Sequence, residues 1–121
     1  MVEAKSDKSK NLLKISYSGE VHPDELKIGA ERIKMILSDL QPGFWLLTDL
    51  SKLELMDVAC AVHIKRVMDW CNKKGLSKVV RVIPDPHKDI GLSIMSLFHY
   101  RRRVHIVTCE TLQEAMTGLE G

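Results

Sequence analysis

The chain has 121 residues, of which 45% are hydrophobic and 28% charged, a composition that is ordinary for one globular domain. Its 18 basic and 16 acidic side chains give a net charge of +2, which is too small to favour a nucleic-acid or membrane partner by bulk attraction. Apolar runs stay well short of the roughly 18 residues of a membrane span, and none follows the charged amino terminus, so neither a membrane helix nor a secretory signal is predicted.

Strand signals come first in the chain, followed by a helix. Residues 12–19 form a strand-like run that carries Leu12, Ile15 and Tyr17 and is closed by a Ser-Gly turn signal, so we expect a strand there. Apolar and polar residues alternate before it, which leaves two alternatives for residues 1–10, a short first strand or a flexible arm. The sequence HPD at 22–24 is typical of a helix start, and QPG at 41–43 of a helix end.

Strands and helices then alternate to the end of the chain. Residues 44–50 are a near-continuous apolar run, typical of a strand that is covered on both faces. Residues 58–74 carry a helical pattern that stops at Gly75. A further strand, helix, strand and helix are predicted, in that order, at 76–84, 89–100, 104–108 and 111–119.

This order of elements predicts a single α/β domain over residues 1–121. Strands that alternate with helices form parallel βαβ units, and the helices pack on a central sheet. We therefore expect a mostly parallel sheet of four to five strands with about four helices, in the order β(β)αβαβαβα.

Three short motifs resemble the STAS domain, a family named from sulphate transporters and anti-sigma-factor antagonists. SYSGEV at 16–21 is similar to the strand ending in Gly-x-aliphatic that precedes that family's first helix. LLTDLSKLELMD at 46–57 resembles its central signature, in which a buried strand ends in Asp-Leu-Ser and an Asp opens the next helix. TLQEAM at 111–116 is similar to its closing helix. The resemblance covers nearly the whole chain and implies a STAS-like fold.

The resemblance also implies regulation by docking rather than catalysis. In bacteria such domains bind a kinase-like anti-sigma factor. Phosphorylation of a Ser or Thr just after the helix-opening Asp weakens the docking, because a phosphate brings a charge of about −2 to the interface. In this chain Asp57 is followed by VACA, without the usual glycine, and no hydroxyl occurs over residues 58–74. We therefore predict a domain that lacks the usual phosphorylation switch.

The helical pattern over 58–74 indicates which side chains meet a partner. On a wheel of 100° per residue, Val58 and Val62 fall beside Lys65, on the side turned away from the sheet. Apolar side chains on that side favour a contact surface, although single exposed valines are common. Similar off-stripe apolar residues occur on the first and third predicted helices, at Ile28, Met35, Leu92 and Met95. The predicted partner-binding residues are Asp57, Val58, Ala59, Val62 and Lys65.

The three cysteines indicate reduced thiols in a cytoplasmic protein. Their number is odd and they form no CxxC pair, so no disulfide framework is predicted. A thiol at a helix N-terminus can be reactive. Cys60 and Cys71, however, share the helix stripe of Ile64 and Val67 that should face the sheet, which favours a core role for both.

The alternative function is small-ligand binding in the crevice where the strands end. Asp57 is expected to cap its helix, and Asp49 to lie near it at the carboxyl edge of the sheet, where open α/β sheets bind ligands. The small side chains after Asp57 would leave room at the helix N–H groups for an anion, a nucleotide or a lipid. Turn and cap roles are the other interpretation of both acids. The residues of this alternative site are Asp49, Ser51, Asp57 and Ala59.

No residue pattern favours catalysis, a metal or a cofactor. The five histidines lack a spacing such as HExxH, and no GxGxxG, P-loop or GxSxG motif occurs. The basic cluster at 101–103 could pair with a phosphate or an acidic patch, but a solvated turn is the more ordinary interpretation. The sequence thus predicts a non-enzymatic, cytoplasmic, regulatory protein-protein interaction domain. Its partner would be a kinase-like anti-sigma factor or a scaffold component, with a second copy of the chain as the alternative.

Overall fold

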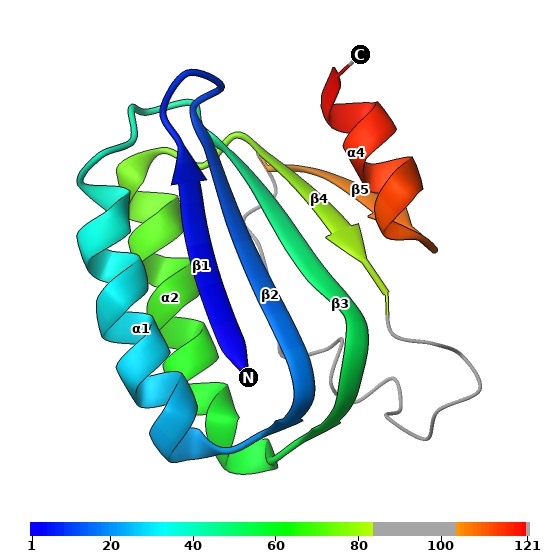
Figure 1. Ribbon diagram of the computed structural model, residues 1–121. Coiled ribbons are helices and arrows are strands. Elements are labelled where there is room, and N and C mark those ends of the chain that lie inside the picture. The colour runs from blue at the N-terminus through cyan, green and yellow to red at the C-terminus, as the bar shows by residue number, and fades with distance from the viewer. Residues whose placement is uncertain (84–103, 121) are drawn as a thin grey trace.

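A five-stranded sheet forms the centre of the computed structural model, which describes residues 1–83 and 104–120 (Figure 1). The strands lie side by side in the order β1 (Val2–Asp7), β2 (Leu12–Val21), β3 (Trp45–Met56), β4 (Lys78–Val82) and β5 (His105–Cys109). β1 and β2 are antiparallel, and each later pair of neighbours is parallel. The predicted, mostly parallel sheet is confirmed, and residues 2–7 form a strand rather than a flexible arm.

Helices cover both faces of this sheet. α1 (Pro23–Leu37) and α2 (Ala61–Lys74) pack side by side on one face, and α4 (Leu112–Glu120) lies on the other (Figure 1). A short 3-10 turn, η1 (Val58–Cys60), leads into α2. The described part of the chain has three α-helices where about four were expected, and the helix predicted over 89–100 lies outside it. Among the described helices, none has the length and apolar character needed to cross a membrane.

Apolar side chains at helical spacing seat α1 and α2 on the sheet. The buried residues of α1 are Leu26, Ala30, Ile33 and Leu37, and those of α2 are Ile64, Val67, Met68 and Cys71. Each set forms one stripe because three or four residues make a helical turn. α2 ends at Gly75, whose φ of 106° is left-handed and whose N–H donates to the carbonyls of Cys71 and Asn72.

β3 is longer than its apolar run predicted. The expected end was residue 50, but the strand continues to Met56 because it pairs with β2 as far as Val21. Register shifts interrupt this pairing, so Leu50, Leu53 and Met56 are all buried although they are three residues apart. That spacing breaks the two-residue period of a regular strand, which explains why the sequence pattern did not reveal it.

The sheet separates two hydrophobic cores. The larger core lies between the sheet and the pair α1 and α2, and the smaller one lies under α4. Successive residues of β3 serve different cores, since Leu46 belongs to the larger and Leu47 to the smaller. The members of the smaller core are Leu47, Val80, Val82, Cys109 and Ala115.

Candidate protein-docking surface

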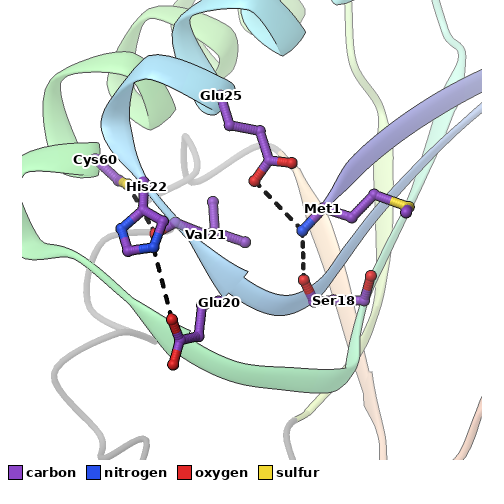
Figure 2. Close-up of polar contacts among 7 residues, drawn as sticks. All are labelled: Met1, Ser18, Glu20, Val21, His22, Glu25 and Cys60. Atoms are coloured by element: carbon purple, nitrogen blue, oxygen red, sulfur yellow. Dashed lines mark hydrogen bonds and ion pairs between the residues drawn. The ribbon is translucent and has the colours of Figure 1, made fainter.

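The turn that leads into α2 is fixed by Asp57 and Cys60. The Asp57 carboxylate accepts a hydrogen bond from the Ala59 N–H at 2.9 Å, which confirms the predicted cap. The Cys60 thiol donates to the Val21 carbonyl at 3.6 Å, and the Asp57 N–H donates to the same carbonyl at 3.2 Å. Figure 2 shows the sulfur of Cys60 directed at this end of β2. The turn is therefore attached to the sheet at both of its ends.

Both cysteines of this segment belong to the core, as predicted. Cys60 of η1 and Cys71 of α2 are fully buried in the larger core. Burial raises the pKa of the Cys60 thiol, and the nearby Asp57 carboxylate raises it further. Burial alone raises the pKa of Cys71 to about 12. Neither thiol is therefore ionised near neutral pH, so nucleophilic chemistry has no support here.

The outer side of the helix pair carries large exposed apolar side chains. Val58 is 78% exposed and Val62 is 59% exposed, which confirms that both point away from the sheet. On the neighbouring helix, Ile28 and Met35 are 74% and 75% exposed. Leu92 and Met95, for which the sequence predicts a similar position, lie outside the described residues. α1 and α2 cover the same face of the sheet (Figure 1). The four exposed side chains belong to these helices and to the turn η1 that leads into α2.

Polar contacts hold the two helices of this layer together. An ion pair joins Arg66 of α2 to Glu31 of α1 at 3.0 Å. The Arg66 guanidinium also lies 5.0 Å from the centre of the Trp70 ring, and Lys34 of α1 approaches that ring at 5.3 Å. The Arg66–Trp70 contact lies within α2, whereas Glu31 and Lys34 reach that helix from α1. Sequence reasoning missed the contacts between the helices, because partners such as Glu31 and Arg66, 35 residues apart, leave no periodic signal.

The beginning of α1 is anchored beside the turn that opens α2. The ammonium of Met1 donates to the Ser18 carbonyl at 2.5 Å and lies 3.3 Å from a carboxylate oxygen of Glu25 (Figure 2). His22, at the start of the helix, lies 3.7 Å from Glu20. Both helices begin at the end of the sheet where β2 and β3 finish, so their first turns are neighbours (Figure 1).

The residues of the alternative anion site do not meet in one place. Asp49 lies within β3 and accepts hydrogen bonds from the Ser51 N–H at 3.0 Å and the Ser51 hydroxyl at 2.6 Å. Asp57 follows the end of the same strand, eight residues further on, which is roughly 25 Å of extended chain. The expectation that the two acids lie close together is wrong, because β3 does not end at residue 50. The Ala59 N–H is also already bonded to Asp57.

Metal-ligating side chains are not clustered in the part of the chain that the structure describes. Over 1–83 and 104–120, no three His, Cys, Asp or Glu side chains are grouped so that they could hold a metal ion. The basic cluster at 101–103 lies outside these residues. What the described surface offers is exposed valine, alanine and lysine on a fixed turn, a combination suited to contact.

Solved structures share this architecture over nearly their whole length. The anti-sigma factor antagonist SpoIIAA in its unphosphorylated form superposes with a TM-score of 0.68 at 13% identity, covering 100% of this chain and 99% of that one. The chain has a SpoIIAA-like fold. A Shewanella loihica protein described as having that fold gives a TM-score of 0.67 at 12% identity, covering 98% of this chain and 92% of that one.

An anti-sigma factor antagonist from Mycobacterium paratuberculosis gives a TM-score of 0.60 at 16% identity, covering 100% of this chain and 94% of that one. No sequence profile of a protein family matches the chain, and no curated protein matches it by sequence. The STAS-like architecture that the three motifs indicated is thus confirmed at the level of the SpoIIAA-like fold.

Proposed function

We propose that this chain is a non-enzymatic regulatory domain that docks on a partner protein through the turn before α2 and the first turns of that helix. The docking surface consists of Asp57, Val58, Ala59, Val62 and Lys65. The observation that carries the proposal is the 78% exposure of Val58 on a turn fixed at both ends. The partner is a kinase-like anti-sigma factor in the cytoplasm, since proteins with this fold include anti-sigma factor antagonists.

The physical argument is that a fixed apolar projection binds with little loss of conformational freedom. Val58 and Val62 would transfer apolar area from water to the partner, and a β-branched side chain has few rotamers to lose. Asp57 is already committed to the cap, so its role is to hold the turn. Lys65 is exposed on the same helix and adds a positive charge at the edge, which favours an acidic rim on the partner.

Docking by this surface is not regulated by phosphorylation of a hydroxyl side chain in η1 or α2. The segment from Val58 to Lys74 has no Ser, Thr or Tyr, so no side chain there can take the modification that weakens docking in relatives with a switch. The interaction is therefore constitutive, or it is regulated elsewhere than on this helix.

The test is the affinity for the purified kinase-like anti-sigma factor of the same organism, measured by calorimetry. Val58→Asp and Val62→Asp should each weaken binding at least tenfold, which corresponds to about 1.4 kcal/mol. Met116→Asp is the matched control, because Met116 is 38% exposed on α4, across the sheet. Equal binding by Val58→Asp and the unchanged chain, or equal weakening by the control, would contradict the proposal.

A second measurement addresses the missing switch. Incubation with the partner and ATP should leave the peptide that covers residues 57–74 without phosphate, as read by mass spectrometry. Stoichiometric phosphate on that peptide would refute the unswitched mode of docking and leave the docking surface itself to the affinity test.

A further inference from the structure

A cavity of about 410 Å³ lies on the α4 face of the sheet, where β2 and β3 begin. It is lined by Lys10, Leu12, Trp45 and Leu119. Its volume falls within the roughly 300–1,000 Å³ of small-molecule sites. The docking surface proposed above lies on the other face of the sheet, so the cavity is a separate feature.

Cross-strand register builds the floor of this cavity. Leu12 of β2 pairs with Trp45 of β3, which pairs in turn with Lys78 of β4, so the three side chains leave the same face of the sheet. Leu119, in the last turn of α4, lies over this row. Leu12 and Leu119 are half-buried and pack against the smaller core, so the cavity is an opening at the edge of that core.

Two lysines and one aspartate lie around the cavity, so the local charge is positive by one. Lys10 belongs to its lining, and the Lys78 ammonium lies 4.3 Å from the centre of the Trp45 ring. The acid in the same cross-strand row is Asp7, the partner of Leu12. Its carboxylate stays negatively charged, because hydrogen bonds from the Ser9 hydroxyl at 2.6 Å, the Lys10 N–H at 3.3 Å and the Ser9 N–H at 3.0 Å lower its pKa. A bound anion would therefore meet two lysines against one carboxylate, whose acceptor oxygen is already taken up by residues 9 and 10.

We propose that this cavity binds a small amphipathic carboxylate. The alkyl or aryl part contacts Leu12, Trp45 and Leu119, and the carboxylate is held by Lys10 and Lys78. The apolar side chains supply the affinity, because they remove the ligand's hydrocarbon part from water. The two ammonium groups select an anionic head through charge-assisted hydrogen bonds.

The experiment follows the fluorescence of Trp45. The chain has two tryptophans, so Trp70→Phe leaves Trp45 as the reporter. Titration with decanoate, below its micelle concentration, should give a saturable change in emission. Decylamine and decan-1-ol have the same chain without the anion and should bind at least tenfold more weakly. The double variant Lys10→Gln, Lys78→Gln should weaken decanoate at least tenfold, whereas Lys65→Gln on the helix face should have no effect.

Three outcomes would overturn the proposal: no saturable change with decanoate, equal binding of decylamine, or equal weakening by Lys65→Gln. Amide NMR spectra of the 15N-labelled protein provide a second readout. Decanoate should shift the resonances of Leu12 and Leu119 and leave those of Val58 and Val62 unchanged. Val58→Asp should bind decanoate normally, so the failure of one proposal does not imply the failure of the other.

Discussion

The thiol of Cys60 donates a hydrogen bond to the backbone carbonyl of Val21, 3.6 Å away, and so joins the turn before α2 to the end of β2. That carbonyl also accepts the N–H of Asp57 at 3.2 Å. Val58 lies between these two anchored residues with its side chain in solvent. A buried cysteine thus positions an exposed valine, which gives the proposed docking surface a defined shape before any partner arrives.

Removing the cap should loosen that turn. Asp57→Ala is expected to lower the free energy of unfolding by about 1 kcal/mol, because the Ala59 N–H loses its acceptor. Asp57→Asn keeps an acceptor oxygen and should cost only a few tenths of that amount. Urea denaturation measures both variants, and equal losses would show that the carboxylate is not acting as a cap.

The buried thiol of Cys71 should make stability depend on alkaline pH. Burial raises its pKa from 9.0 to about 12 in the folded chain. A raised folded pKa adds stability that is complete below the unfolded value and is lost as the pH climbs toward the folded value. The free energy of unfolding should therefore fall above pH 9, by up to about 1.4 kcal/mol per pH unit.

Cys71→Ala controls for the other groups that titrate in this range. The variant is less stable at every pH because it leaves a cavity, but its curve should decline less steeply above pH 9 than that of the unchanged chain. Urea denaturation at increasing pH gives the free energy of unfolding of both proteins. If the two curves fall in parallel, the titrating group is not Cys71.

Substitution by alanine should lower the free energy of unfolding at Gly75 and raise it at Gly118. At Gly75 the φ of +106° is left-handed, and an added Cβ would lie 3.0 Å from the Pro42 Cβ and 3.1 Å from its Cα. Gly75→Ala should cost about 1–3 kcal/mol. Gly118 lies in α4 with nothing within 4 Å of the added atom, so Gly118→Ala should gain up to about 1 kcal/mol. Thermal unfolding of the pair tests the prediction, and a loss at both positions would contradict it.

Docking variants should leave the fold intact. Val58→Asp and Val62→Asp change exposed positions, so their free energies of unfolding should stay within about 0.5 kcal/mol of the original. Ile64→Ala, on the buried stripe of the same helix, should cost about 2–5 kcal/mol. If an aspartate variant destabilises as much as Ile64→Ala, its loss of binding reports unfolding and not contact.

The sequence by itself determined the order of the elements in the described residues, 1–83 and 104–120, and the inward stripes of α1 and α2. These features are local, because a helix repeats about every 3.6 residues and each cap or turn spans only a few. The cap role of Asp57 follows from its place just before the helical pattern. The period itself predicts which residues are buried, Cys60 and Cys71, and which are exposed, Val58 and Val62. The absence of a hydroxyl in α2 also needed only the sequence.

Only the tertiary structure decided how far β3 extends and which distant side chains meet. The strand continues past residue 50 because β2 offers it partners up to Val21, and the same extension separates Asp49 from Asp57. The cavity at Trp45 likewise depends on where the far end of α4 lies over the sheet. Such features arise from pairing and packing between segments that are remote in the chain, and no local period encodes them.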